Sequence, residues 1–142
     1  MKITIEILEE GGGRSIQEAG ELLSMPEPRI NHSQVTVNTS IVIYGGVDKD
    51  GNCFDDIWMY DLITNFWKKI QINGVIPKAR QGHTALVVDT DQILFFGGKI
   101  ANIFEVNELW KFDLNTNRFD LIQGTLLQRE GFNRQVKPRI IS

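Results

Sequence analysis

Two histidines are the first candidates for chemistry, because an imidazole can act as a general base or a metal ligand near neutral pH. His32 and His83 each end a Pro-x-x-Arg-x-x-His stretch, at residues 26–32 and 77–83. They occupy the same place in two copies of one pattern, so they belong to separate units, and no Asp, Glu or Cys recurs beside them at metal-ligand spacing. We therefore expect structural histidines, with no catalytic residue, no metal site and no cofactor.

The acidic stretch DKDGNCFDD, residues 48–56, suggests calcium, which prefers oxygen ligands. An EF-hand loop counted from Asp48 needs glycine at its sixth place and glutamate at its twelfth, where this chain has Cys53 and Met59. A turn-rich loop is the better prediction. Cys53 is the single cysteine of the chain, so an internal disulfide is excluded and we expect an ordinary free thiol.

The elements that must position these residues are repeated along the chain. DIWMYDLITNFWKKI at 56–70 aligns without a gap on ELWKFDLNTNRFDLI at 108–122, and IVIYGG at 41–46 matches ILFFGG at 93–98. The upstream Pro-x-x-Arg-x-x-His stretches match at an offset one residue shorter, so the second unit gains a residue between its first two apolar runs. Self-similarity at about 50 residues is typical of a repeat architecture.

Each unit is predicted to form four short strands. The first two are nearly continuous apolar runs, as expected for strands covered on both faces, whereas the later two alternate more. Gly-Gly at 45–46 and 97–98 predicts a sharp bend or a close approach after the second strand. The DLITN and DLNTN segments predict turns in which Asp accepts bonds from backbone N–H groups and Asn adopts a left-handed conformation. A hairpin turn can absorb the one-residue insertion.

Residues 26–122 resemble kelch repeats, the blades of a β-propeller, in the order Pro-x-x-Arg-x-x-His, Gly-Gly, Asp/Glu-x-Trp-x-Tyr/Phe-Asp and a later aromatic. The resemblance implies an all-β fold: a partial propeller with two four-stranded antiparallel blades in an open ring, at residues 26–73 and 74–124. Phe112 and Phe119 replace the family's Tyr and Trp and keep the packing role. The resemblance assigns structural roles to Gly45, Gly46, Gly97, Gly98, Trp58, Tyr60, Trp67, Trp110, Phe112, Phe119, His32 and His83.

The flanking segments depart from the repeat. In residues 1–25 an alternating stretch and a Ser-x-x-Glu capping spacing predict a strand, a loop and a short helix, which fit the remnant of a preceding blade. The glycines there match no phosphate-binding loop. KPRIIS at 137–142 echoes EPRINHS at 27–33, so we expect 125–142 to be a loop and the start of a truncated third blade. Propellers use about 4 to 8 blades, which predicts a fragment of a larger propeller or an oligomer.

The resemblance also implies a binding surface. In kelch propellers the loop entering the first strand and the loop after Gly-Gly lie on one face and form a pocket for a partner peptide. By that resemblance the candidates for recognition are Arg29, Arg80, Asp48, Asp50 and Lys99. The two arginines recur beside the two histidines, which also favours a structural role for them, so both interpretations stay open.

We expect a non-catalytic protein-protein interaction module that binds a protein or peptide. The alternative is part of a propeller enzyme, of the oxidase or sugar epimerase type, whose catalytic residues lie outside this chain. A net charge of −3 supplies no positive field for nucleic acid or an anionic membrane, and no stretch has the length of a transmembrane span. With one cysteine and an acidic N-terminus, the chain is expected in the cytoplasm, or in the nucleus.

Overall fold

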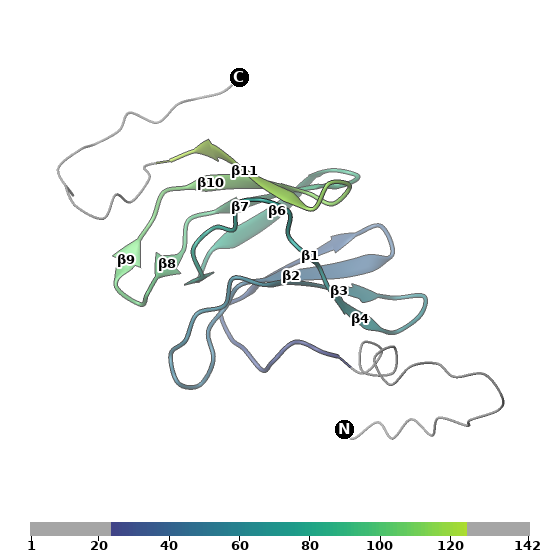
Figure 1. Cartoon of the computed structure of the whole chain (residues 1–142), viewed down its shortest axis with the longest axis horizontal. Coiled ribbons are helices and arrows are strands. Elements are labelled where there is room, and N and C mark those ends of the chain that lie inside the picture. The colour runs from purple at the N-terminus through teal and green to yellow at the C-terminus, as the bar shows by residue number, and fades with distance from the viewer. Residues whose placement is uncertain (1–23, 125–142) are drawn as a thin grey trace.

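The computed structural model describes residues 24–124, and within them every regular element is a β-strand (Figure 1). The prediction of an all-β fold with two four-stranded antiparallel blades is confirmed. The strand and helix predicted near the N-terminus and the third blade predicted to start near the C-terminus lie outside the described residues. In this part of the chain no helix is long and apolar enough to cross a membrane.

Blade 1 is an antiparallel sheet in which the strands follow one another in chain order, and each strand pairs with the next. The β1–β2 turn has two residues, Asn38 and Thr39, because Val37 pairs with Ser40. Asn38 has φ 52°, the left-handed conformation that Asn tolerates in tight turns. The strands of blade 1 are β1 (Ser33–Val37), β2 (Ser40–Tyr44), β3 (Ile57–Asp61) and β4 (Trp67–Lys69).

Blade 2 repeats this order and accommodates the extra residue in a bulge. Val87 pairs with Ile93 and Asp89 pairs with Gln92, so Val88 is left over just before a two-residue turn. The predicted insertion between the first two strands therefore appears as a β-bulge at the hairpin. The strands of blade 2 are β6 (Thr84–Asp89), β7 (Gln92–Phe96), β10 (Leu109–Asp113) and β11 (Arg118–Gln123).

A third sheet was not predicted from the sequence. It consists of β5 (Arg80–Gln81), β8 (Lys99–Ile100) and β9 (Phe104–Glu105), and joins the segment before β6 to the segment after β7. In blade 1 two isolated bridges, Ile30 to Val47 and Val47 to Cys53, make the same connections. Both units thus pair the segment that enters the first strand with the segment that follows Gly-Gly.

The turns behave as their residues predict. Asp61 Oδ1 accepts bonds from the backbone N–H groups of Ile63 at 2.8 Å and Thr64 at 3.3 Å, and Asp113 does the same in blade 2. Asn65 and Asn117 both have positive φ, 61° and 54°. The third and fourth strands are therefore joined by the same turn in both blades.

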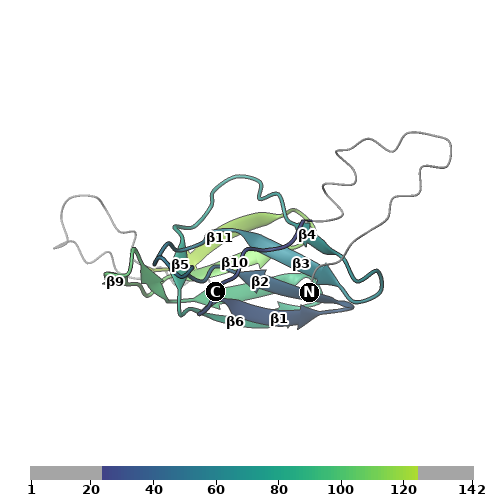
Figure 2. The same ribbon diagram turned by 90° about the horizontal axis from the view of Figure 1, so that it is seen from below.

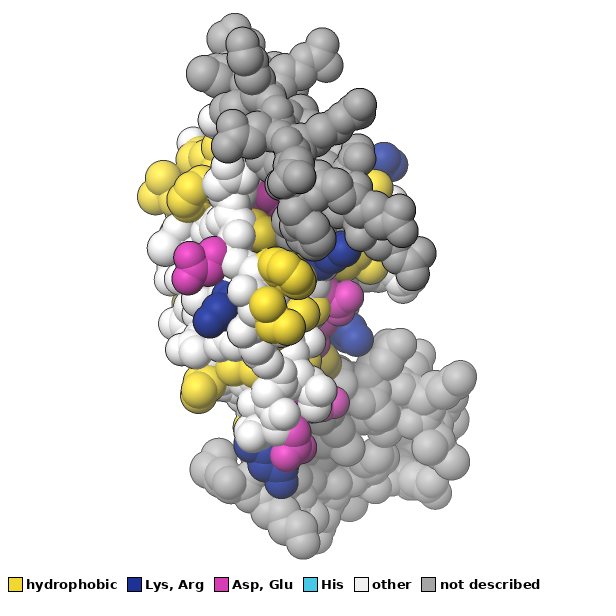
Figure 3. Space-filling view, turned by 90° about the vertical axis from the view of Figure 1, so that its left-hand side faces the viewer, with side chains coloured by type: hydrophobic (Ala, Val, Ile, Leu, Met, Phe, Trp, Pro, Cys, Tyr) yellow, Lys and Arg dark blue, Asp and Glu magenta, His cyan; other side chains and the backbone are white. Residues whose placement is uncertain are grey.

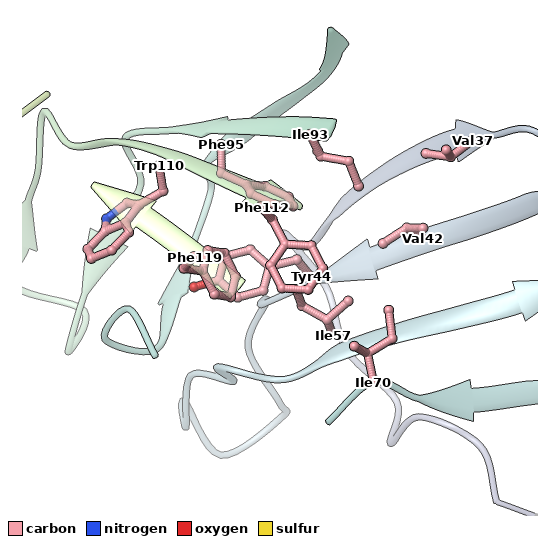
Figure 4. Packing of buried hydrophobic residues seen from close by; sticks show 10 residues of the cluster. All are labelled: Val37, Val42, Tyr44, Ile57, Ile70, Ile93, Phe95, Trp110, Phe112 and Phe119. Atoms are coloured by element: carbon pink, nitrogen blue, oxygen red, sulfur yellow. The ribbon is translucent and has the colours of Figure 1, made fainter. Parts of the chain in front are cut away.

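The two blades pack face to face, and their first strands, β1 and β6, run side by side (Figure 2). Aromatic and branched side chains from the two facing sheets point toward one another between them (Figure 4). Tyr44 of blade 1 contacts Phe95 and Phe119 of blade 2, with ring centroids 4.8 and 5.5 Å apart. The buried core consists of Val37, Val42, Tyr44, Ile57, Ile70, Ile93, Phe95, Trp110, Phe112 and Phe119.

Coverage of the first two strands differs between the blades. In β2, Val42, Ile43 and Tyr44 are all buried, as the apolar run predicts. In blade 2, however, Leu86 of β6 is 63% exposed and Phe96 of β7 is 52% exposed. The expectation of two covered faces is therefore wrong for β6 and β7 in this structure, because only one face of blade 2 packs on a described blade.

Candidate functional site

The candidate site is the loop face, which we define as residues 29–31, 47–54, 78–82 and 98–106. These segments lie where the chain enters the first strand of each blade and where it leaves the Gly-Gly pair. The β5–β8–β9 sheet holds them together in blade 2, and the bridges of Ile30, Val47 and Cys53 do so in blade 1. The site combines parts of both blades.

Arg29 is held inside blade 1. Its Nη1 lies 2.6 Å from Asp56 Oδ1 and also donates to the carbonyl of Gly45 at 3.1 Å. The guanidinium carbon lies 3.9 Å from the centroid of the Phe54 ring, a cation–π geometry. Asp56 also accepts a bond from Trp58 Nε1 at 2.8 Å. The guanidinium is therefore engaged by a carboxylate, a carbonyl and a ring.

Blade 2 repeats this arrangement with Glu108 in place of Asp56. Arg80 Nη2 donates to Glu108 Oε2 at 2.8 Å, and its Nη1 donates to the carbonyl of Gly97 at 3.2 Å. Trp110 Nε1 donates to the same Glu108 oxygen at 2.9 Å. The whole Arg80 residue is only 2% exposed. This placement favours the structural interpretation of both arginines over direct contact with a partner.

Burial and bonding act on the Asp56 carboxyl in opposite directions. Desolvation alone raises its pKa, but the hydrogen bonds from Arg29 and Trp58 and the charge of Arg29 outweigh it. The net effect lowers the pKa of Asp56 below its usual 3.8. The carboxylate that holds Arg29 therefore stays ionised near neutral pH.

The two histidines occupy equivalent places at the entry to the first strands. His83 is buried, and its Nε2 lies 2.7 Å from Ser33 Oγ of blade 1. Its ring lies edge-on to Tyr44, with centroids 5.0 Å apart. Burial and the nearby Arg80 charge lower the pKa of His83 to about 4. A neutral His83 thus helps to join the two blades, and His32 holds the same position in blade 1.

The three other candidates lie at the loop face, with different exposure. Asp48 is partly buried and closes its own loop, since its carboxylate accepts bonds from the backbone N–H groups of Asp50 and Asn52. Those bonds, that of Asn52 foremost, lower the pKa of Asp48. Asp50 is exposed. Lys99 is half-buried in β8, between Gln81 of β5 and Glu105 of β9.

Sequence reasoning missed the residues that connect the loops of the two blades. Asn102 Nδ2 donates to the carbonyl of Gly51 at 2.6 Å, and the Cys53 thiol lies 3.5 Å from Asn102 Oδ1. Gln81 Nε2 donates to Asn102 Oδ1, and Gln81 Oε1 accepts from Asn31 Nδ2 at 2.9 Å. The contacts to Gly51, Cys53 and Asn31 cross from blade 2 to blade 1. Because the residue type differs at the aligned positions of the other repeat, the alignment of the repeats gave no signal for Asn31, Gln81 and Asn102.

Exposed apolar side chains lie in the same loops as these polar contacts. Ile103 is 71% exposed at the β8–β9 turn, the neighbouring Phe104 is 39% exposed, and Ile30 is 64% exposed. Figure 3 looks onto this end of the molecule and shows hydrophobic side chains near its centre, with acidic and basic side chains around them. Apolar residues inside a charged rim are typical of a protein-binding surface. Within residues 24–124, no cluster of three or more His, Cys, Asp or Glu side chains could hold a metal ion.

Comparison with known proteins gives consistent matches. The KLHDC2/KLHL20/DRC7 kelch-repeats domain matches residues 15–133. Kelch domain-containing protein 3 of Bos taurus is 30% identical over 105 residues, which cover 72% of this chain and 27% of that protein. Ras guanine nucleotide exchange factor F of Dictyostelium discoideum is 37% identical over 106 residues, covering 72% of this chain and 9% of that protein.

One of the similar proteins has a name that describes a synthetic activity. tRNA wybutosine-synthesizing protein 4 of Aspergillus fumigatus is 29% identical over 92 residues, which cover 61% of this chain and 9% of that protein. The chain therefore spans 27% or less of the length of each of these three curated relatives.

Proposed function

The chain belongs to the kelch-repeat family, and on this premise we propose that it is a non-catalytic module whose loop face binds an extended segment of another protein. Kelch repeats generally mediate protein-protein interaction. The observation that carries the proposal is the contact of Asn102 in blade 2 with the carbonyl of Gly51 in blade 1. This contact makes one surface from loops of two blades.

The composition of the loop face supports a peptide ligand. Ile30, Ile103 and Phe104 supply apolar area, and Asp50 and Lys99 offer charges of opposite sign beside it. The framework that presents them is rigid, because strand pairing and the two buried arginine pairs fix the bases of the loops. A fixed surface loses little conformational entropy on binding, which favours affinity.

Two further expectations belong to the same proposal. We infer a location in the cytoplasm or nucleus, which agrees with the free Cys53 thiol. Membership of a larger propeller enzyme, with catalytic residues elsewhere, stays an alternative prediction that no described residue tests. The domain boundaries at residues 25, 73 and 124 likewise stay predictions.

Selection of peptides would test the binding proposal. The purified 142-residue chain is immobilised and exposed to a phage-displayed library of linear peptides, and the affinities of enriched peptides are then measured for variants. Ile103→Asp should weaken the binding of these peptides at least about tenfold, since it places a charge within the apolar area of the loop face. Asp50→Lys and Lys99→Glu should each change affinity less, and in opposite directions for a charged peptide.

The matched control is Ile63→Asp. Ile63 is 74% exposed, but it lies in the β3–β4 turn at the opposite end of blade 1. This variant should bind the selected peptides as the wild type does. Equal loss of binding in Ile103→Asp and Ile63→Asp, or enrichment of peptides that neither change affects, would rule out the loop face.

A further inference from the structure

The segment that joins the two blades, residues 70–79, contains a dipeptide that the proposed function does not use; we call this segment the linker. Asn73 and Gly74 form the single Asn-Gly pair of the sequence, and both residues are exposed. They lie between β4 and β5, where the chain arches outside the strands (Figure 2). Asparagine is one of the chemically labile residues of proteins, and a following glycine leaves its side-chain amide open to attack because glycine has no Cβ. The dipeptide is therefore a candidate site of modification.

The backbone nitrogen of Gly74 is the attacking atom in this chemistry, and it is unhindered. Gly74 has φ 85°, a conformation that glycine adopts without strain. Its N–H has no hydrogen-bond partner among residues 24–124. Because the nitrogen and Cγ of Asn73 belong to adjacent residues, the attack is intramolecular and has a large entropic advantage over attack by a separate molecule.

Other positions in the chain lack one of these features. Each remaining asparagine precedes a residue with a side chain, which crowds the attacking nitrogen. Asp50 and Gly51 form the single Asp-Gly pair, which could close the same kind of ring. There, however, Gly51 N–H donates to the carbonyl of Asp48 at 3.2 Å, so the attacking nitrogen is engaged inside its own loop. Asn73 is the position at which sequence and structure both favour the reaction.

Asn73 also fastens the linker to blade 2. Its backbone N–H donates to the carbonyl of Asn117 at 2.8 Å, and its Nδ2 donates to the carbonyl of Thr116 at 2.9 Å. Both acceptors belong to the turn between β10 and β11. A Cβ added at Gly74 would lie 3.3 Å from Nη2 of Arg118, so the linker runs close to the start of β11 as well. The reactive amide is thus one of the groups that hold the linker in place.

We propose that Asn73 is a site of spontaneous deamidation and that the reaction detaches the linker from blade 2. The Gly74 nitrogen loses its proton and forms a bond to Cγ of Asn73, while the bond from Cγ to Nδ2 breaks and Nδ2 leaves as ammonia. Water then opens the resulting succinimide ring. Addition of water at Cγ gives aspartate, and addition at the main-chain carbonyl carbon gives isoaspartate, in which the backbone runs through Cγ. Water is the co-reactant, and nothing is oxidised or reduced.

Either product removes the contact with blade 2. In aspartate a carboxylate oxygen replaces the donating Nδ2, so two acceptors face each other at the Thr116 carbonyl and the bond is lost. In isoaspartate the backbone gains a carbon atom, which displaces the N–H that Asn117 binds. The strand pairs of both blades are not touched. The effect should therefore be a local opening of the linker, with both blades still folded.

The same contact controls how fast the folded chain reacts. Cγ of Asn73 reaches the Gly74 nitrogen only after the amide leaves the Thr116 carbonyl, so the reaction proceeds from the open linker. Asn73 should therefore react more slowly in the folded chain than in the chain unfolded in urea. It should still react faster than every other asparagine of the folded chain.

Peptide mapping of the purified 142-residue chain, kept at mildly alkaline pH, tests the modification. Trypsin releases residues 70–78 as one peptide with a single asparagine, and mass spectrometry follows its conversion. Asn73 should convert at least about tenfold faster than any other asparagine. Gly74→Ala should slow the conversion at least about tenfold, measured in urea so that folding does not matter, because the methyl group crowds the nitrogen. Conversion at the rate of the other asparagines, or equal rates in folded and unfolded wild type, would overturn the proposal.

Hydrogen exchange tests the release of the linker. Asn73→Asp reproduces one product, and the N–H of residue 73 should then exchange at least about tenfold faster than in wild type, with exchange in β7 and β10 unchanged. Thr116→Asp is the matched control, because it adds the same charge to the exposed turn and keeps the Asn73 amide and both carbonyls. It should exchange as wild type does at residue 73. Unchanged exchange in Asn73→Asp, or an equal increase in both variants, would contradict release through the lost bond.

Discussion

The two blades share one framework but differ in what surrounds it. Both have the same strand order, the same Asp-Asn turn and the same buried arginine pair, yet Tyr44 is buried and its counterpart Phe96 is exposed. The glycine pairs show the same contrast, because Gly45 contacts the neighbouring blade and Gly97 does not. The position of a residue in the repeat therefore determines its local conformation. Whether a blade packs on it determines how much the free energy of unfolding depends on that residue.

The largest effect should come from the arginine pairs, and it should differ between the blades. Arg80→Ala leaves the Glu108 carboxylate, 7% exposed, without its partner, which should lower the free energy of unfolding by about 3–5 kcal/mol. Arg29→Ala should cost about 2 kcal/mol, because Asp56 is 15% exposed and water can reach it. Urea denaturation of both variants measures the difference; equal losses would remove this contrast between the blades.

The buried histidine makes the blade contact sensitive to acid. The pKa of His83 is about 4 in the folded chain against 6.5 for an ordinary histidine, so the unfolded chain binds a proton that the folded chain does not. Stability should therefore fall as the pH drops from about 6.5 to about 4, by about 3 kcal/mol in total. Asp56, with a pKa below 3.8, loses its contribution only at more acid pH.

The control for this pH dependence is His83→Gln, which retains His32 and every carboxylate. Its unfolding free energy should fall about 3 kcal/mol less over the same range. Unfolding at several pH values, followed by tryptophan fluorescence, gives both slopes. If the unfolding free energy of wild type and of His83→Gln changed equally with pH, His83 would accept a proton without leaving the blade contact.

Substitution of the first glycine in each pair should sharpen the comparison further. Both positions have positive φ, 67° at Gly45 and 72° at Gly97, so alanine strains the backbone to the same extent at each. At Gly45 the added Cβ also approaches the Arg80 carbonyl to 2.8 Å. Gly45→Ala should therefore cost about 2 kcal/mol more than Gly97→Ala in thermal unfolding. Equal costs would show that the two blades can move apart enough to accommodate the added methyl group at Gly45.

The smallest expected difference concerns the Asp turns, where the blades are alike. Asp61→Ala and Asp113→Ala each remove two bonds to backbone N–H groups of the same lengths, 2.8 and 3.3 Å. Each should lower the unfolding free energy by about 1 kcal/mol, with less than about 0.5 kcal/mol between them. A clear inequality would indicate that a blade's neighbour also affects its far turns.

The repeat pattern predicted most of the fold because its signals are local. Gly-Gly, the Asp-Asn turns and the apolar runs each constrain neighbouring residues, and the structure places strands and turns where they indicate. The pairing of Arg29 with Asp56 and of Arg80 with Glu108 was available too, since all four residues recur between the units. We did not predict it, because Asp56 was considered within the acidic 48–56 stretch and both carboxylates within the repeated third-strand motif, without a partner.

Other features depend on contacts between the units, which a comparison of the units with each other does not reveal. The β5–β8–β9 sheet joins segments that vary in sequence, and its strands have only two residues each, too short for an alternating pattern. Asn102 contacts Gly51 through a side chain that the first repeat lacks. The exposure of Leu86 and Phe96 depends on whether another blade covers them, and their apolar character gives no information on this.

The bond from Asn102 to the Gly51 carbonyl has a thermodynamic consequence for any ligand of the loop face. A ligand that touches both loops binds only when the two blades are docked, so it favours the docked arrangement over any in which they separate. Whatever strengthens the contact between Tyr44 and His83 raises the docked fraction, and the affinity of such a ligand rises in proportion to that fraction. Ligand binding at the loop face and packing at the core then depend on the same equilibrium, the docking of the two blades.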